Sequence, residues 1–525
     1  MISNMKLATS NQIKQIDKLS TSKYHIPSQI RMEIAGIKSY EIVKREYAPR
    51  NTLIVIGTGN NGGDGLVLAR YLKLNGYKCS ILITKTSKIQ SGDFKSNLLM
   101  IKKLKIQTIK DLKKVRFKDY DLIIDGIFGV GLNRPLNNKI LDLVKRLNKE
   151  STPICSLDLP SGLNPDNGKT YSGSIVADTT ITYDFAKPGL VTDPGAKFSK
   201  KVFIVSLPTP NDLTKQLNTY FINSNFFTNF FRERSKSSNK GTFGHVLIIG
   251  GSKNMSGAVL LSGLAAYKSG SGLVTLCVPR NISSNLKNKI PEAIILEVPN
   301  SSDSSTMDEN KLFPLLKKNI RKEPSCVVIG PGLGNRKNLI KIIEDSFKFF
   351  NCPIILDADG LNLISNNPKI LKKYKNDLII TPHPGEMSKL CNESIKSIQS
   401  NRIEFAQKIS KDLKCISVLK GFRTILSDKS GKTFINGSGN EGMATGGMGD
   451  ALTGIIASFI GQGYSSIDSA ILGVFLHGKA GDTIGSKISK RGILASQIIK
   501  ELPNTILSLE KNSHSPNPIY KIENE

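Results

Sequence analysis

Near the end of the chain stands the stretch Asn436-Gly-Ser-Gly-Asn-Glu-Gly-Met-Ala-Thr-Gly-Gly-Met-Gly-Asp-Ala-Leu-Thr-Gly454. Asp450 lies where an apolar pattern with helical spacing begins, so we expect a helix to start there. Glycines let backbone amides approach a ligand closely, and the amides at a helix N-terminus favour phosphate. A carboxylate in the same turn can accept a proton from a substrate hydroxyl. The stretch therefore predicts a phosphoryl-transfer site, and the alternative is a glycine-rich turn capped by aspartate.

The residues before this stretch show alternating strand and helix patterns from about residue 244 onwards. Several of the apolar runs end in polar or glycine-rich segments. These segments are Gly330-Pro-Gly-Leu-Gly334, Asp357-Ala-Asp359, His383 with Glu386, and Lys420. Ligand groups in open parallel sheets gather at the carboxyl ends of strands. We therefore expect these segments to meet beside the glycine-rich stretch.

The N-terminal half shows the same alternation. The apolar run Leu53-Ile-Val-Ile56 enters Gly57-Thr-Gly-Asn-Asn-Gly-Gly-Asp-Gly65, and an amphipathic helix pattern follows. Two later apolar runs end in Asp125 and in Asp158 with Ser161. The glycine spacing differs from the dinucleotide fingerprint, and the added Asn and Asp side chains indicate a polar ligand and a cation. Taken singly, each Asp is as well explained as a turn residue.

These patterns predict an α/β protein with two three-layer α/β domains. We place the first domain at residues 1–225, a linker at 226–238 because 232–241 is polar, the second domain at 239–510 and a polar tail at 511–525. The 525 residues are ample for two separate cores.

Composition excludes several other classes. No apolar run has transmembrane length and the first residues form no extended apolar segment, so we expect a cytoplasmic protein that contacts no membrane. The seven scattered cysteines include no C-x-x-C pair and are expected to be reduced. The net charge of +30 comes from lysines spread along the whole chain, which indicates a compositional bias and no nucleic-acid partner.

Three signatures of the N-terminal half resemble the NAD(P)H-hydrate epimerase family: Gly59-Asn-Asn-Gly-Gly-Asp-Gly65, Asp125-Gly-Ile-Phe-Gly-Val-Gly131 and Asp158-Leu-Pro-Ser-Gly162. The resemblance covers about residues 10–215 and implies a Rossmann-like epimerase domain. It implies that the hydrated nicotinamide nucleotide is surrounded by Asn60, Asn61, Gly62, Gly63, Asp64, Gly129, Val130, Gly131, Leu132, Asn133, Arg134, Pro135 and Asp158.

The same resemblance implies two further roles. Asn61, Asp125 and Ser161 would hold a potassium ion, which suits hard oxygen ligands. Asp158 would transfer the proton, which we treat as a hypothesis. Ile34 stands where the family often has Asn, so we expect one polar contact fewer near the site.

The C-terminal half resembles the ribokinase-like superfamily and, within it, the ADP/ATP-dependent NAD(P)H-hydrate dehydratases. The supporting motifs are Gly330-Pro-Gly-Leu-Gly334, Leu356-Asp-Ala-Asp-Gly-Leu-Asn362, Thr381-Pro-His-Pro-Gly-Glu386, Val418-Leu-Lys-Gly421 and Gly446-Gly-Met-Gly-Asp450. The resemblance covers about residues 240–505. Met448 replaces the common Thr or Gln, but an anion hole needs only its backbone amide.

This second resemblance also implies a set of contacts. The hydrate would touch Ala258, Gly332, Gly334, His383 and Asp450, with Asp450 as the catalytic base. The nucleotide would be held by Lys420, Gly421, Phe422, Arg423, Thr424, Gly446, Gly447 and Gly449. Taken alone, His383 fits a turn histidine and Lys420 fits a surface lysine.

Together the resemblances imply a bifunctional repair enzyme for NADHX and NADPHX. One half would interconvert the R and S epimers, and the other would dehydrate the S epimer with ADP or ATP and magnesium, releasing phosphate and, from ADP, AMP. The fused form favours ADP, and we expect a homo-oligomer. The rival readings are a ribokinase-like small-molecule kinase with a fused ligand-binding domain, and a non-catalytic binding protein associated with RNA.

Overall fold

The structure is a computed structural model that describes residues 5–84, 92–112, 115–228, 230–511 and 520–523. Its contacts divide the chain into two compact units. One comprises Met5–Thr219 together with a short strand near the C-terminus, and the other begins at Tyr220. The division falls a few residues before the predicted linker, because Phe226 and Phe227 are buried in the core of the second unit.

The N-terminal unit is built on a sheet with the strand order β19-β8-β7-β6-β5-β2-β3-β4. All neighbours pair in parallel except β19, which is antiparallel to β8. The strands are β2 (Asn51–Ile56), β3 (Lys78–Ile83), β4 (Gln107–Ile109), β5 (Leu122–Gly126), β6 (Ile154–Leu157), β7 (Ala177–Tyr183), β8 (Ser199–Val205) and β19 (Tyr520–Glu523), while β1 (Met5–Leu7) bridges to Ala186. Part of the predicted polar tail thus extends this sheet as β19.

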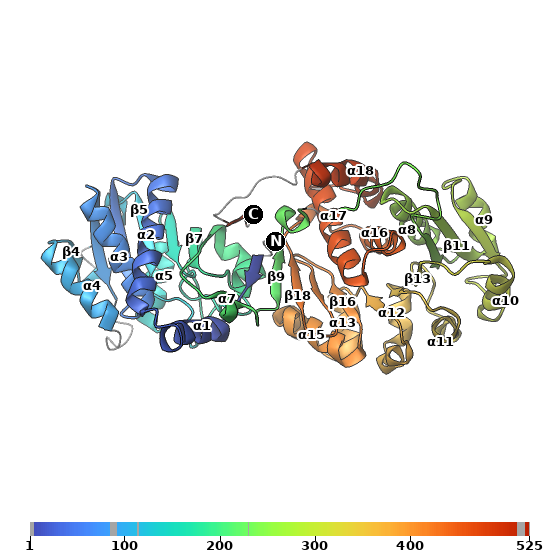
Figure 1. Ribbon diagram of the computed structural model, residues 1–525, viewed down its shortest axis with the longest axis horizontal. Helices are drawn as coiled ribbons and strands as arrows, with labels where there is room; N and C mark the ends of the chain where they lie inside the picture. Colours follow the sequence, from blue (N-terminus) through green and yellow to red (C-terminus); the bar gives the residue numbers. More distant parts are fainter. Residues whose placement is uncertain (1–4, 85–91, 113–114, 229, 512–519, 524–525) are drawn as a thin grey trace. The chain divides into compact units, whose positions relative to one another are not determined.

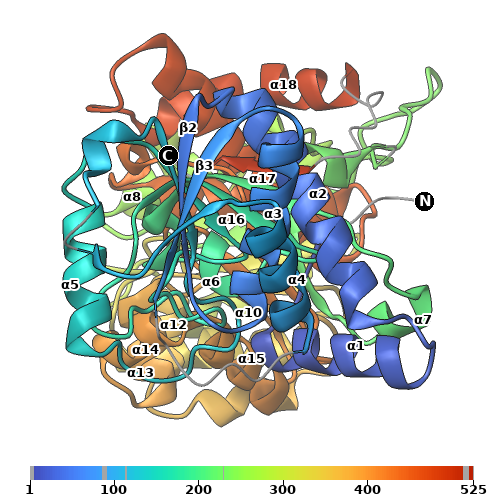
Figure 2. The ribbon, with the colours of Figure 1, turned by 90° about the vertical axis from the view of Figure 1, so that its left-hand side faces the viewer.

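Helices cover both faces of this sheet, with α2, α3 and α4 on one side and α5 on the other (Figures 1 and 2). The helices are α1 (Ser10–Ser22), α2 (Ser28–Tyr47), α3 (Asn60–Leu74), α4 (Gly92–Lys103), α5 (Asn138–Leu147), α6 (Pro188–Val191) and α7 (Asn211–Thr214). Short 3₁₀ turns are η2 (Phe117–Asp119) and η3 (Gly195–Phe198).

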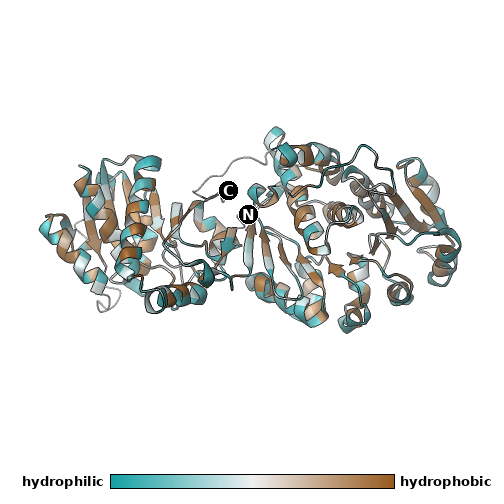
Figure 3. Ribbon diagram, in the orientation of Figure 1, coloured by the Kyte–Doolittle hydropathy of each residue, from teal (hydrophilic) through white to brown (hydrophobic). Residues whose placement is uncertain are grey.

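The two-sided cover explains why the central strands are apolar without alternation. In β2, Ile54 and Ile56 pack with α2 and α3, whereas Leu53 and Val55 pack with α5. Figure 3 shows the same arrangement as apolar strands between helices that are polar on their outer sides. The unit is therefore three-layered, and loops at the ends of its strands are free to form a site.

The C-terminal unit contains the strand order β9-β18-β17-β16-β15-β14-β13-β10-β11-β12. The neighbours β12, β11, β10, β13, β14, β15 and β16 pair in parallel in that order. Strands β16, β17 and β18 pair antiparallel. The strands are β9 (Thr219–Ile222), β10 (His245–Ile249), β11 (Leu273–Pro279), β12 (Ile294–Val298), β13 (Cys326–Ile329), β14 (Ile354–Leu356), β15 (Leu378–Ile380), β16 (Ile416–Leu419), β17 (Ile425–Ser427) and β18 (Thr433–Asn436).

Helices again lie on both faces, and α8, α16, α17 and α18 form one layer (Figure 1). The helices are α8 (Ser256–Lys268), α9 (Arg280–Lys287), α10 (Glu309–Asn319), α11 (Ile340–Phe349), α12 (Asp359–Ile364), α13 (Pro384–Cys391), α14 (Ile395–Ser400), α15 (Arg402–Leu413), α16 (Met448–Gly461), α17 (Ser466–Lys487) and α18 (Ala495–Lys511). The 3₁₀ turns are η4 (Ser224–Phe227), η5 (Lys337–Leu339), η6 (Pro368–Lys373) and η7 (Glu441–Met443). Helices α8 and α16 pack closely: a Cβ on Gly454 would lie 2.1 Å from the Ser262 carbonyl oxygen.

The predicted fold class, two three-layer α/β domains, is confirmed. The run 417–426 holds two strands, because the chain leaves the β region at Gly421 (φ 142°) and Arg423 (φ 55°). Cys155 and Cys277 are buried free thiols, as expected. In the described part of the chain, no helix is both long enough and apolar enough to span a membrane.

Candidate active sites

The N-terminal unit has a cavity of about 560 Å³ at the carboxyl ends of β2, β5, β6 and β7, which are neighbours in the sheet. Most of the predicted substrate residues line it. They are Asn60, Asn61, Asp64, Gly129, Val130, Gly131, Leu132, Asn133, Arg134 and Asp158. The loops after these strands therefore line one cavity, and Ile34 lies outside the lining.

Gly62, Gly63 and Pro135 are outside the lining as well. A Cβ on Gly62 would lie 2.1 Å from the Gly57 carbonyl oxygen, and one on Gly63 would lie 2.5 Å from the Met32 side chain. The two glycines are therefore required for the close packing of the turn, and their contribution to a ligand is indirect.

Asp158 follows β6, and its carboxylate accepts hydrogen bonds from two residues. Its Oδ1 accepts a hydrogen bond from Lys187 Nζ at 2.6 Å, and its Oδ2 accepts one from the Val130 backbone amide at 3.0 Å. Its φ of 63° is left-handed, which is uncommon for a residue with a side chain. This backbone directs the carboxylate towards the loop that follows β5.

Lys187 was not predicted from the sequence. Its side chain is 1% exposed and lies in the same cavity wall, just before α6. A second ion-pair group, Arg31 with Asp17 (2.9 Å) and Asp184 (2.7 Å), joins α1, α2 and the end of β7. No pattern in the sequence marks these pairs, because a buried and an exposed lysine or arginine have the same local signature.

Asp64, in the first turn of α3, differs from Asp158. Burial and then the negative charge of Asp158 raise its pKa well above the ordinary value. No hydrogen-bond partner of its carboxyl group is found among the described residues. Burial therefore disfavours the charged form of this cavity-lining carboxyl group.

Of the predicted potassium ligands, Ser161 and Asp125 are joined by a hydrogen bond of 2.6 Å, and Asn61 lines the cavity. Asp125 is fully buried and accepts hydrogen bonds from Ser156, Ser161 and the Ile127 amide. Within the described ranges it has no cationic side chain as a partner. Asn61 Oδ1 is buried and has no hydrogen-bond donor there either. A buried carboxylate without a cationic partner and an unused amide oxygen are each suited to bind a hard monovalent cation.

The C-terminal site lies at the carboxyl ends of β13, β14, β15 and β16, which are consecutive neighbours in the sheet. The loop after β13 brings Gly332 against Ala258, whose Cβ would be 3.1 Å from a Cβ on the glycine. The Gly334 amide donates to Asp359 at 2.8 Å. These contacts unite the predicted hydrate-binding residues of α8 and the β13 loop.

An ion pair forms the centre of this site. Lys420 Nζ lies 2.8 Å from Asp357 Oδ1 and 3.9 Å from Glu386 Oε2, and Thr453 donates to Asp357 Oδ2 at 2.7 Å. Burial alone would raise the pKa of Asp357, but the Lys420 ammonium holds it below its usual value. Burial raises the pKa of Glu386 to about 7. Lys420 is thus tied to a buried carboxylate, which its sequence position does not reveal.

Asp450 occupies the first turn of α16, as predicted, and is half-buried beside the exposed Gly446. The helix is preceded by Gly447 with φ 84°, a conformation that favours glycine. Burial, followed by the charge of Asp357, raises the pKa of Asp450 to about 7. A carboxyl with this pKa is suited to proton transfer at neutral pH, and it stands beside backbone amides that lack intrahelical partners.

The predicted nucleotide loop, Lys420 to Thr424, is anchored from below. Arg402 is buried and donates to the carbonyls of Leu419, Lys420 and Phe422. Arg423 is also buried and donates to the Gly437 carbonyl, so its guanidinium points inwards. Its predicted ligand contact is accordingly limited to its backbone.

His383 caps α13. Its Nδ1 accepts hydrogen bonds from the amides of Gly385 (3.0 Å) and Glu386 (3.3 Å), while its ring remains largely exposed. Burial and the nearby Lys420 charge lower the pKa of His383. The ring thus caps α13 through Nδ1, while its Nε2 lies 3.5 Å from Glu386 Oε1.

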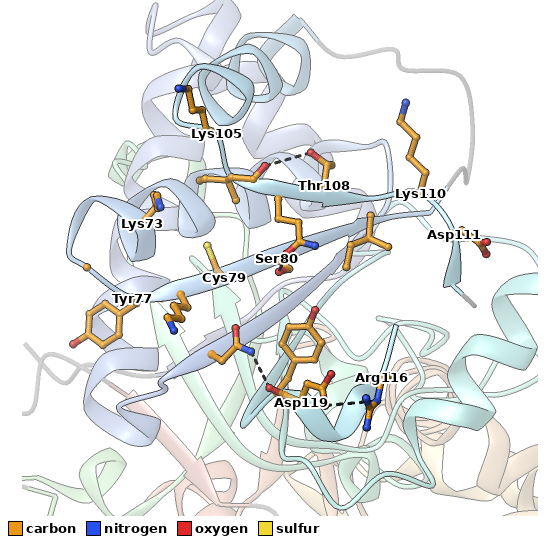
Figure 4. Close-up of a pocket in the computed structure, with 17 residues that line it drawn as sticks. Lys73, Tyr77, Cys79, Ser80, Lys105, Thr108, Lys110, Asp111, Arg116 and Asp119 are labelled. Carbon is orange, nitrogen blue, oxygen red and sulfur yellow. Dashed lines mark hydrogen bonds and ion pairs between the residues drawn. The ribbon is translucent and has the colours of Figure 1, made fainter. Parts of the chain in front are cut away.

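A second cavity of about 880 Å³ lies over β3 and β4 (Figure 4). It is lined by residues such as Lys73, Ser80, Lys105 and Lys110 and by the beginnings of three strands. None of the predicted site residues belongs to it. This cavity is therefore separate from the predicted sites.

Comparison with known proteins finds relatives of both halves of the chain. The family model for NAD(P)H-hydrate dehydratase matches residues 246–504, and the model for the YjeF-related protein N-terminus matches residues 28–189. A bifunctional NAD(P)H-hydrate repair enzyme of Moorella thermoacetica is 34% identical over 97% of this chain and 98% of its own. One of Escherichia coli is 30% identical over 90% and 88%.

A solved structure is also similar. It is an ADP/ATP-dependent NAD(P)H-hydrate dehydratase from Bacillus subtilis, co-crystallised with ATP and Mg²⁺. It is 28% identical, with a TM-score of 0.48, and the match covers 55% of this chain and 98% of that one.

Proposed function

The chain belongs to the family of bifunctional NAD(P)H-hydrate repair enzymes, and from this premise we propose how its two sites divide the repair. The N-terminal site interconverts the R and S forms of NADHX and NADPHX. The C-terminal site dehydrates the S form with ADP or ATP and restores NADH or NADPH. The observation that carries this assignment is the position of Asp450, on the first turn of α16 and facing charged groups that follow β14, β15 and β16.

In the C-terminal site, the ring hydroxyl of the hydrate is a poor leaving group until it is phosphorylated. Asp450 accepts the hydroxyl proton while the terminal phosphoryl group of the nucleotide is transferred to the oxygen. The amides around Gly446–Gly449 stabilise the charge on that group. Phosphate then leaves with the bonding electrons of the carbon–oxygen bond, and the adjacent ring carbon loses a proton, which restores the dihydropyridine.

The nucleotide is placed by the loop Lys420–Thr424 and the start of α16. A Cβ on Gly449 would lie 3.1 Å from Lys420 Nζ, so the ammonium stands beside the helix N-terminus, where phosphate is favoured. Among the described residues, no group of three or more His, Cys, Asp and Glu side chains is placed to hold a metal ion. We propose that magnesium binds mainly to the phosphates and to water, which is its usual mode.

In the N-terminal site, Asn61, Asp125 and Ser161 would hold potassium beneath the nucleotide. The ion would supply the positive charge that the buried Asp125 carboxylate otherwise lacks. The loop Gly129–Arg134, together with Asn60, Asp64 and Asp158, would surround the hydrated ring. Asp158 and Asp64 are the carboxyl groups placed to act on it.

One assay tests the whole proposal. The protein is incubated with a mixture of both hydrate epimers and either ADP or ATP, and the recovery of reduced-nicotinamide absorbance is followed. Recovery of the full mixture supports both sites, and recovery of the S share alone supports only the C-terminal one. A stable phosphorylated hydrate without free phosphate would favour the rival small-molecule kinase. Parallel reactions with ADP alone and with ATP alone show which nucleotide drives the dehydration, and we favour ADP.

The potassium site predicts a selective ion dependence. Replacing potassium by tetramethylammonium is expected to slow epimerisation of the R hydrate and to leave dehydration of pure S hydrate unchanged. Asn61→Ala is expected to raise the potassium concentration for half-maximal epimerisation about tenfold or more. Asn60→Ala changes the neighbouring exposed side chain and should keep the wild-type midpoint. An ion-independent epimerase rate would contradict the assignment.

The raised pKa of Asp450 predicts the pH profile of dehydration. Because a base must be deprotonated, kcat for the S hydrate should rise with pH through about 7 and fall roughly tenfold per unit below it. The groups facing Asp450 are Asp357, Asp359, Glu386 and Lys420. Glu386→Gln removes a negative charge, so this limb should move to lower pH. A flat profile between pH 6 and 8 would rule out Asp450 as the titrating base.

Two properties outside the sites complete the proposal. We propose a cytoplasmic homo-oligomer that binds neither membrane nor nucleic acid. Light scattering on the purified chain measures the oligomeric state directly.

A further inference from the structure

We propose that Lys187 is a positioning residue of the epimerase site, which fixes the Asp158 carboxylate and, through it, the loop that begins at Gly129. The inference rests on the proposed epimerase function and adds a residue to its machinery. Lys187 lies just before α6, one strand beyond Asp158 in the sheet. No motif in the N-terminal signatures includes it.

The surroundings of Lys187 are unusual for a lysine. Its side chain is 1% exposed although the chain carries 73 lysines and arginines in total. Nζ donates to Asp158 Oδ1 at 2.6 Å, to Thr182 Oγ1 at 2.8 Å and to the Tyr183 carbonyl at 3.2 Å. An ammonium has three protons, and all three are used. Lys187 therefore has no proton left for a substrate and acts through Asp158.

The ion pair continues into the substrate loop. While Lys187 holds Oδ1, Oδ2 accepts the Val130 amide at 3.0 Å. A Cβ on Gly129 would lie 2.4 Å from Oδ2, so the loop approaches the carboxylate as closely as glycine permits. Rotating the carboxylate would break both hydrogen bonds at once. Lys187, Asp158 and Val130 consequently form one clamp across the ends of β5, β6 and β7.

Removing the ammonium should change the rate more than the binding. The Asp158 carboxylate would lose its charged partner in a buried place, and it would turn towards water and release the Val130 amide. The carboxylate and the loop would then move away from their productive positions. A small displacement of a reacting group commonly lowers the rate about a hundredfold. Contacts made by Asn60, Asn133 and Arg134 remain, so KM should change less than kcat.

The test compares Lys187→Met with Lys200→Met in the full chain. Lys200 makes an ion pair of similar length with Asp178 (2.7 Å), but on the exposed side of β8. For Lys187→Met we expect kcat for epimerisation of the R hydrate to fall about a hundredfold, with KM within threefold. Dehydration of pure S hydrate by the same molecules should be unchanged, which shows that the C-terminal unit is unaffected. Lys200→Met should match the wild type in both assays.

Two further measurements separate a positioning role from a structural one. Ethylammonium added to Lys187→Ala should restore part of the epimerase kcat, and tetramethylammonium should not. In an Asp158→Asn background, Lys187→Met should cause no further loss of rate, and this double variant carries no unpaired buried charge if the single variant fails to fold. The proposal is overturned if Lys187→Met keeps kcat within threefold, or if the losses in the double variant multiply. A wild type that does not epimerise would instead reject the function.

Discussion

Asp450→Asn is expected to slow dehydration of the S hydrate on the order of 10³-fold, the middle of the range for a lost general base. Asn has nearly the same shape but cannot accept the hydroxyl proton. The backbone amides of Gly446–Gly449 keep their positions, because α16 begins before residue 450 and its start depends on Gly447. KM for the hydrate should therefore change little, and single-turnover kinetics with ADP or ATP measure the loss directly.

Asp468→Asn is the matched control for this variant. Asp468 lies in the first turn of the next helix, α17, where its carboxylate accepts a hydrogen bond from the hydroxyl of Ser465, the N-cap residue. Its replacement should leave both activities at wild-type levels. Epimerisation by Asp450→Asn should also be unaffected. An Asp450→Asn enzyme that dehydrates at more than a tenth of the wild-type rate would show that another group is the base.

The same variant has a stability signature whose direction follows from linkage. The folded-state pKa of Asp450 is raised to about 7, so its contribution to stability is present at low pH and is lost as pH rises through 7. The wild type thus carries an unfavourable charge at pH 8 that Asn lacks. Asp450→Asn should melt at a higher temperature than the wild type at pH 8, and the difference should shrink at pH 5.

The positions of the strands along the sequence were open to prediction because their patterns are simple. The run Leu53–Ile56 reads as a buried strand, and the polar residues after it, after Ile124 and after Leu157 have to meet if the sheet is parallel. The same rule predicts that Asp450 lies near the loops that follow β13, β14, β15 and β16. Strand ends and helix starts are encoded locally, so the candidate sites could be placed before the structure was known.

Contacts between residues that are far apart in the sequence could not be predicted from local patterns. Lys187 and Lys420 read as ordinary lysines, yet each forms an ion pair with a carboxylate at the end of a different strand. Gly62 and Gly63 belong to a ligand-binding motif but serve the packing of the turn. Strand β19 was not predicted either. A short polar segment forms a strand only where another strand, here β8, offers a free edge.

Lys420→Met should destabilise the C-terminal unit by about 3 kcal/mol, the lower end of the cost of breaking a buried ion pair. Asp357 is 1% exposed, so its carboxylate would be left in the interior with Thr453 as a hydrogen-bond donor but without a cation. Dehydration should fail as well, because the ammonium beside the start of α16 is lost to the phosphates. Urea unfolding of the C-terminal unit measures this effect. The epimerase rate of the same variant serves as the comparison for the N-terminal unit.

Two variants separate the effect of Lys420 on stability from its effect on catalysis. Lys389→Met breaks an exposed contact with Asn362 near the same sheet end and should change stability by less than about 0.5 kcal/mol. Lys420→Met combined with Asp357→Asn removes the uncompensated charge and should recover at least half of the lost stability, since the cost lies in the unpaired carboxylate. Its dehydration should remain slow, because neither side chain can then offer a positive charge to the nucleotide. If the double variant regained activity along with stability, Lys420 would serve the fold alone, and the phosphates would have to be neutralised by the helix amides and magnesium.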